Sequence, residues 1–340
     1  FSELRYSQGP TGHYNGHTVA MTGNYTETGL NLNVNPEYPT LFEYYRKHSD
    51  PAKSALNAWW LSEGLGPYPS LNYSRHIEYG PQYGANYLRP ATTFGNLGDN
   101  FLKEALNYQP DDVQRLHKLT HFLNSNFDRS GMDAGGVINN EEDRQRVKAF
   151  ITGILNGTIP FEWPTPTGTQ QGVSGDLLNI GAAWKVLEAF QPELMVINTF
   201  NLDICHSNFT GYIDFLHKAD YGIGWLWNKI QGPVGAALGL KDDTILICMP
   251  EHGRNMQPNQ LRDQNQLAAY DHTSDQNSRE VFSLIVGPPG KVKQGQVVGN
   301  TSNPVGESID IVPTIAHILG FKDDIPGGLL PGRALTEAFA

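Results

Sequence analysis

The feature of this sequence that most constrains its fold is the alternation of apolar runs with helix-periodic segments in its second half. Residues 194–200, 243–249 and 281–287 are short apolar runs typical of buried strands. Segments with apolar residues at helical spacing lie between and after these runs, at 177–190, 212–231 and 307–320. Alternating strands and helices predict an α/β fold, which we expect to be a three-layer sandwich with a mostly parallel central sheet and helices on both faces.

The first half of the chain predicts helices separated by long connections. Thr40 is the expected N-cap of a helix that ends near residue 48, and Gly23 closes a short helix that begins near residue 17. Further helical patterns cover residues 99–108, 111–127 and 140–157, whereas residues 60–100 are expected to form long ordered loops rich in Gly, Pro, Tyr and Asn. We expect one domain over residues 1–340, with a helical and loop insertion at 60–165.

Composition limits the partners of this chain. The net charge is −11 with only 24 Lys and Arg residues, so nucleic acid is not an expected partner, because its binding needs a basic face. An acidic protein that binds anions needs metal ions to reverse the local charge. No apolar run approaches the ~20 residues of a membrane span. Abundant Tyr, Asn and Gly with few Lys favour an extracellular or periplasmic protein.

Carboxylates and histidines follow or precede the predicted strands. In a parallel sheet, ligands bind at the carboxyl ends of the strands, where such side chains meet. Histidine mixed with carboxylate suits zinc, manganese or iron(II). The three groups are Asp203 with His206, Glu251 with His252, and His272 with Asp271 and Asp275. Each pair alone is also compatible with a solvated loop, but their shared side of the sheet favours a metal site.

The second half of the chain resembles the alkaline phosphatase superfamily, which includes nucleotide pyrophosphatases, phosphodiesterases, phosphonate hydrolases and sulfatases. The segments that carry the resemblance are "INTFNLDICH", "HKADYGIGWLWNKIQ", "DDTILICMPEHGRN", "DHTSD" and "SIDIVPTIAHILGF", with "HTVAMTGNYTETGL" near the N-terminus. In this family two metal ions clamp a phosphoryl group. The resemblance implies one or two divalent ions, most simply zinc. It implies that Asp203, His206 and His272 hold one ion and that Glu251 and His252 help to hold the other.

The sequence departs from the family pattern in its first strand, in its metal ligands and in its nucleophile. The family begins with a strand that ends in a metal-binding Asp, and no such strand precedes "FSELRYSQGPTGH"; either it lies outside this sequence or the site is incomplete. Asp203 and His206 are three residues apart, where the metallophosphatases have four, and Glu251 replaces the usual Asp. The sulfatase pattern Cys-X-Pro-X-Arg does not occur, so we do not expect a formylglycine sulfatase.

The nucleophile is the third departure. Counting back from Thr22 and Gly23, as the family pattern requires, places His13 at the nucleophile position, and Thr11 lies two residues away. Thr11 and His13 are therefore the candidate catalytic residues. His13 and His17 would share a helix face, where they could bind a metal ion or line a polar pocket.

Two functions follow from these patterns. The first is an exported, metal-dependent hydrolase of small-molecule phosphate mono- or diesters. The second is a non-catalytic extracellular binding or structural protein on the same fold, with an eroded active site.

Overall fold

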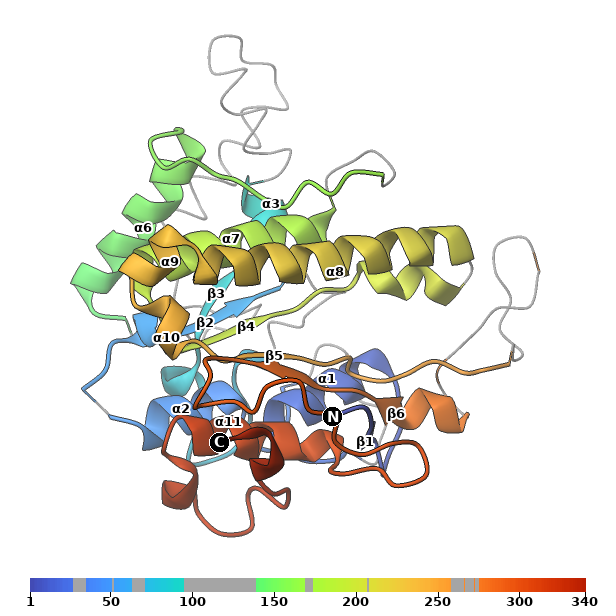
Figure 1. Ribbon diagram of the computed structural model, residues 1–340. Coiled ribbons are helices and arrows are strands. Elements are labelled where there is room, and N and C mark those ends of the chain that lie inside the picture. Colours follow the sequence, from blue (N-terminus) through green and yellow to red (C-terminus); the bar gives the residue numbers. More distant parts are fainter. Residues whose placement is uncertain are drawn as a thin grey trace.

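Short strands lie between two groups of helices in the computed structural model of this chain (Figure 1). The structure describes residues 1–26, 35–50, 52–62, 71–94, 139–168, 174–206, 208–257, 266, 272 and 275–340. The helices on one side are α3 (Pro90–Phe94), α6 (Glu141–Leu155), α7 (Gly175–Phe190) and α8 (Phe209–Gln231). Those on the other are α1 (His13–Thr22), α2 (Leu41–His48) and α11 (Ile311–Ile318). Two short helices, α9 (Pro233–Ala237) and α10 (Leu240–Asp243), follow α8.

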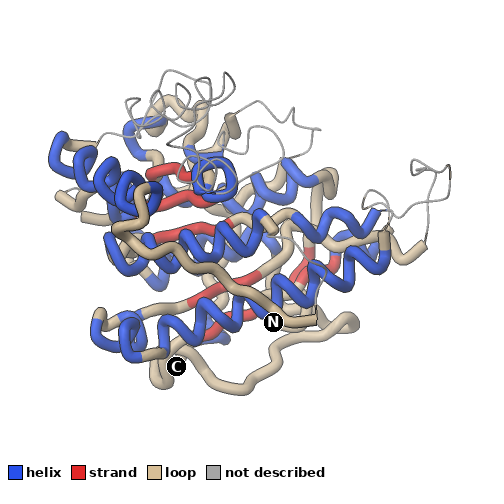
Figure 2. The backbone as a smooth tube through the Cα atoms, turned by 90° about the horizontal axis from the view of Figure 1, so that it is seen from above, coloured by secondary structure: helices blue, strands red, loops and turns tan. Residues whose placement is uncertain are grey.

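Three parallel strands form the main ladder, in the order β3 (Asn86–Leu88), β2 (Ala58–Leu61) and β4 (Leu194–Ile197). Neighbouring side chains of a strand point to opposite faces. Accordingly, Trp59 packs with α6 and α7, whereas Trp60 packs with α1, α2 and α11. Each of the two indole rings is only 1% exposed, so helices cover both faces of this ladder. Figure 2 shows the strands flanked by helices from above. The α/β prediction with parallel strands is therefore confirmed.

In the described ranges, the strands form separate ladders rather than one continuous central sheet. The predicted strand at 243–249 is β5 (Leu246–Cys248), which pairs antiparallel with β7 (Leu284–Val286). In the described part of the chain, no ladder joins β5 to β4. Among the described residues the parallel ladder has three strands, and a three-layer sandwich around one central sheet remains a prediction.

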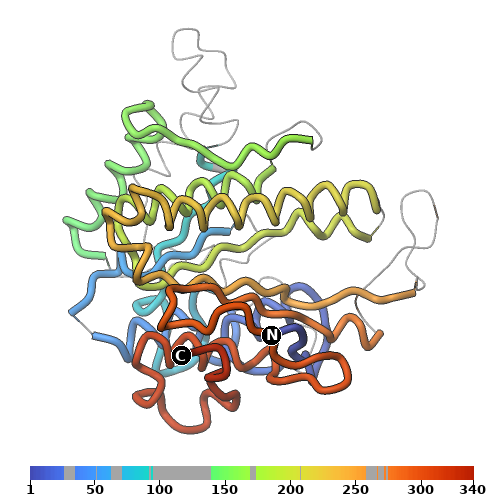
Figure 3. Tube along the Cα trace, viewed as in Figure 1, coloured from blue at the N-terminus to red at the C-terminus, as the bar shows by residue number. Residues whose placement is uncertain are grey.

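The predicted strand at 281–287 is divided into two. β6 (Glu280–Val281) pairs with β1 (Leu4–Arg5), whereas β7 pairs with β5. Between them, the Ser283 N–H donates to the Phe1 carbonyl at 3.0 Å. The N-terminal segment therefore lies beside this late part of the chain (Figure 3), and its pairing interrupts the strand.

The expectation of loops over residues 60–100 is wrong at β3 and at the end of β2. Asn86–Leu88 is only three residues long and carries no clear alternation, so its strand conformation depends on pairing with Trp59, Trp60 and Leu61. α3 also falls within this range. Within the predicted insertion, Leu88 and α6 pack in the same apolar cluster as α7. The predicted helices at 99–108 and 111–127 lie outside the described residues.

Local signals predicted the helix ends well. Thr40 is the N-cap of α2 and forms a capping box with Glu43, as expected. Gly23 ends α1 with a positive φ of 69°, a backbone conformation that glycine adopts without strain. α1 begins at His13, earlier than predicted, and the His13 ring lies near Asp203 and Glu251, which follow β4 and β5. None of the helices in the described ranges is both long and apolar enough to cross a membrane.

Candidate metal centre

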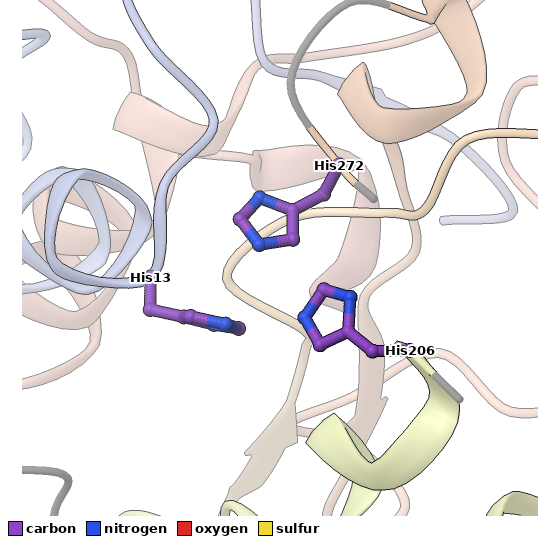
Figure 4. A group of neighbouring side chains, drawn as sticks. All are labelled: His13, His206 and His272. Atoms are coloured by element: carbon purple, nitrogen blue, oxygen red, sulfur yellow. The ribbon is translucent and has the colours of Figure 1, made fainter. Parts of the chain in front are cut away.

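Four separate segments bring their side chains to one cluster. His13 is the first residue of α1, and Asp203 and His206 lie on η4 (Asn201–His206), the short helix after β4. Glu251 and His252 follow β5, and His272 comes from the segment before β6. Figure 4 shows the rings of His13, His206 and His272 turned toward one another from three of these segments. The predicted metal-ligating residues and His13 are thus brought together.

His13 lies at the middle of the cluster. Its Nε2 atom is 2.9 Å from Asp203 Oδ1, and its Nδ1 atom is 3.0 Å from Glu251 Oε1. Nε2 of His252 also lies 3.0 Å from His13 Nδ1. Each nitrogen of this one ring therefore faces a different carboxylate.

His206 and His272 complete the cluster. Nε2 of His206 lies 2.9 Å from Asp203 Oδ1. The ring of His272 stacks on that of His252, with centroids 4.1 Å apart, and lies 5.3 Å from that of His206. The cluster contains two overlapping groups, and within each group the ligand atoms lie within 4.8 Å of one another. The first group is His13, His206 and His272, and the second is His13, Glu251 and His252.

Asp203 Oδ1 is the cluster oxygen that two imidazole rings approach. Asp203 Oδ1 is buried, and in the described part of the chain it accepts no hydrogen bond of good geometry. Yet Nε2 of both His13 and His206 lies 2.9 Å from it. Buried carboxylate oxygens are normally paired. An oxygen and two nitrogens that approach without hydrogen-bond alignment suit ligands placed around a metal ion.

The charges of the cluster depend on mutual contact. Burial would lower the pKa of His13, but close contacts with Asp203 and Glu251 outweigh it and raise this pKa to about 10. Burial would raise the pKa of each carboxyl group, yet the neighbouring histidines hold both pKa values well below their usual range. For His252, burial dominates and lowers the pKa to about 4. At neutral pH the carboxylates are therefore ionised and His252 is neutral, the forms that bind metals, whereas His13 carries a proton that a bound metal ion would have to displace.

Close backbone approach positions the Glu251 side of the cluster. A Cβ atom on Gly16 of α1 would lie 2.6 Å from the Glu251 carbonyl oxygen. A Cβ atom on Gly253 would lie 2.1 Å from the Asn277 carbonyl oxygen, and the Gly253 N–H donates to Ser278 O at 2.8 Å. The two glycines therefore let this loop fit between α1 and η5 (Gln276–Arg279).

Hydrogen bonds from α7 position the Asp203 side. The buried carboxylate of Asp176 accepts the N–H groups of Phe200 and Asn201, each at 2.9 Å. The Ser174 hydroxyl donates to Asn201 Oδ1 at 2.6 Å. These bonds fix the chain immediately before Asp203. Sequence analysis missed Asp176, although its position in the first turn of a predicted helix is a site where a carboxylate often accepts backbone N–H groups.

Thr11 and His17 lie beside the cluster and contact other groups. Thr11 is 1% exposed, and its hydroxyl donates to the His272 carbonyl oxygen. The His272 ring in turn contacts the Thr11 carbonyl through Nδ1 at 2.6 Å. His17 does not join His13 in the cluster: its Nε2 atom contacts Asn198 Oδ1 at 2.8 Å, at the end of β4.

Asp275 does not join the cluster either. It is the N-cap of η5, where its carboxylate accepts the N–H groups of Asn277 and Met256, each at 2.9 Å. Asp271 lies outside the described residues.

Comparison with known proteins gives no family for this chain. No protein-family profile matches, and no curated protein matches. Seven chains of solved structures match. One of them, titled "Crystal structure of Ps i-CgsB", is 14% identical with a TM-score of 0.38, over 98% of this chain and 67% of that chain. A likeness at this level carries no argument about function.

Proposed function

We propose that this chain is a metal-dependent hydrolase of small-molecule phosphate mono- or diesters. Asp203, His206 and His272 would hold one divalent ion, zinc in the simplest case. Glu251 and His252 would hold a second. The observation that supports this proposal is the gathering of the predicted ligands around His13: His206 and His272 form one group with His13, and Glu251 and His252 form another, with ligand atoms within 4.8 Å in each group. Asp203 Oδ1 lies 2.9 Å from both His13 and His206.

Charge supports an anionic substrate only together with metal. The chain has a net charge of −11, and two ionised carboxylates lie in the cluster itself. An anionic ester would be repelled there unless divalent ions reversed the local charge. When bound, such ions stabilise charge on phosphoryl oxygens and lower the pKa of water.

Thr11 is the candidate for the group that attacks phosphorus. Thr11 immediately precedes the N-terminus of α1, which favours negative charge, but its hydroxyl is donated to the His272 carbonyl oxygen. Attack on phosphorus would require that hydroxyl to turn toward the cluster. Substitution Thr11→Val removes the hydroxyl and keeps the branched shape. If Thr11 is the nucleophile, the variant loses turnover and retains its metal; if turnover persists, the nucleophile lies elsewhere.

The proposal is tested by metal analysis of the purified protein together with chromogenic phosphate mono- and diester assays. We expect bound divalent metal, hydrolysis of at least one ester, loss of activity with a chelator, and recovery with zinc. A protein that binds no metal and hydrolyses neither ester would overturn the proposal.

A second function is favoured by one specific observation. His13 occupies the position that the resemblance gives to the nucleophile, and the nearby Thr11 hydroxyl is used in a structural bond. A non-catalytic extracellular binding or structural protein would retain the ligand cluster without turnover. Metal binding and binding of inorganic phosphate, with no ester hydrolysed, would support this alternative.

Two broader expectations belong to the same proposal. We infer export to the periplasm or the extracellular space, which a fractionation experiment on the native source would test. We also infer that the parallel ladder and the β5–β7 pair are parts of one three-layer arrangement, in which the ends of β4 and β5 face the same site.

A further inference from the structure

The ring of His13 presents its two nitrogens to two different donor sets. On the Nε2 side lies Asp203 Oδ1 at 2.9 Å, itself 2.9 Å from Nε2 of His206. On the Nδ1 side lie Glu251 Oε1 and His252 Nε2, each at 3.0 Å. A single imidazole thus faces different potential ligands with each of its nitrogens, and it is a member of both groups. The two groups also meet beside it, where the His252 and His272 rings stack.

We propose that His13 is a bridging ligand between two divalent ions. Its Nε2 atom would bind the ion on the Asp203 and His206 side, and its Nδ1 atom would bind the ion on the Glu251 and His252 side. This inference rests on the metal centre of the proposed function and adds a role for His13. Formation of the bridge releases the ring N–H protons to solvent and leaves an imidazolate with one lone pair for each ion.

The positive charge of two ions would have to favour the imidazolate, because Asp203 and Glu251 alone favour a protonated His13 ring. His13 is the first residue of α1, and the N-terminus of a helix favours negative charge, as on an imidazolate. Asp203 and Glu251 add two further negative charges, one on each side. Together these three charges do not cancel two divalent ions, so the centre stays positive and attracts an anionic ester.

The ring is also held as a bridge requires. Contact of Gly16 with the Glu251 backbone fixes α1 against the loop after β5. On the other side, Asp176 fixes the turn that leads to Asp203 through the Phe200 and Asn201 amides. Because α1 carries both His13 and Gly16, the ring and the Glu251 loop are held in one fixed relation, and the Asp203 turn is held separately by Asp176.

The test uses copper(II) as a spectroscopic probe and zinc for stoichiometry. Two copper(II) ions joined by one imidazolate couple magnetically, so fully loaded wild-type protein should give a much weaker electron paramagnetic resonance signal than two isolated ions. His206→Ala and His252→Ala should each bind one ion fewer and give an uncoupled signal. His13→Gln should lose the coupling even where two ions are bound. His217→Gln, an exposed histidine on α8, is the matched control and should retain two coupled ions.

The outcomes separate this inference from the proposed function. Two bound ions without coupling, or one ion at saturation, would overturn the bridge and leave a metal-dependent hydrolase possible. Two coupled ions with no ester hydrolysis would support the bridge and overturn the hydrolase. Wild-type protein that binds neither copper nor zinc would overturn both.

Discussion

The two ligand-bearing segments of the cluster are held by different physical means. The Asp203–His206 turn is half-exposed, with side-chain exposures of 32% and 27%, and side-chain hydrogen bonds from α7 hold it. The loop with Glu251 and His252 is more buried, with side-chain exposures of 25% and 9%. Its backbone packs closely against neighbouring backbone at Gly16 and Gly253. The position of the Asp203–His206 turn therefore depends on the carboxylate of Asp176. The position of the Glu251–His252 loop depends on glycines, whose lack of a side chain allows close backbone contact.

Removal of a deep ligand should have the largest effect. In His252→Ala the Glu251 side loses an imidazole whose lowered pKa keeps it neutral and ready to bind. We expect one metal ion fewer per chain and loss of ester hydrolysis by more than ~100-fold. Metal analysis and the ester assay measure this, with His217→Gln as control. A variant with wild-type metal content and activity would remove His252 from the site.

Crowding the deep loop should have the next largest effect. Gly16→Ala places a Cβ atom 2.6 Å from the Glu251 carbonyl oxygen, so the loop must shift. We expect zinc affinity on the Glu251 side to fall about 10–100-fold and stability to fall by about 1–3 kcal/mol. Gly224→Ala on α8 is the matched control, because its Cβ meets nothing within 4 Å. Equal zinc affinity and stability in the two variants would contradict a role for the Gly16 contact in positioning the Glu251 loop.

Weakening the hydrogen bonds from Asp176 of α7 should affect metal binding on the Asp203 side alone. Asp176→Asn replaces an acceptor of two backbone N–H groups by an amide that can accept with only one oxygen. In a His252→Ala background we expect zinc affinity to fall about 10-fold. In a His206→Ala background it should not change. Glu142→Gln, in the first turn of α6, is the control for loss of charge at a helix N-terminus. An equal loss in both backgrounds would indicate general destabilisation.

The smallest change is expected in the pH dependence of stability. Burial raises the pKa of Asp176 from 3.8 to about 6, although the Phe200 and Asn201 amides favour its charged form. The folded state therefore binds the proton more tightly, so this contribution to stability is lost as pH rises. The free energy of unfolding of wild type relative to Asp176→Asn should fall by about 1 kcal/mol between about pH 5 and about pH 6. Chemical denaturation at each pH measures it; a difference that rises with pH would contradict the assignment.

Much of this protein is determined by local sequence. Helical periodicity predicted α6, α7, α8 and α11, and Thr40 and Gly23 predicted the helix ends at which they lie. Apolar runs predicted β4 and β5. The carboxylates and histidines after these strands predicted which residues gather, because the ends of strands in such folds converge.

Only the tertiary structure decided the rest, because it depends on contacts between distant residues. β3 is a strand through its pairing with β2, and β5 pairs antiparallel with β7 because the chain returns beside it. Gly16 carries no local signal for its role, and the position of Asp176 at a helix start does not reveal that its partners are the Phe200 and Asn201 amides, because each acts on backbone distant in sequence. His13 lies between Asp203 and Glu251 because α1 begins close to the ends of β4 and β5. The spacing of these residues along the chain does not predict how close they are in space.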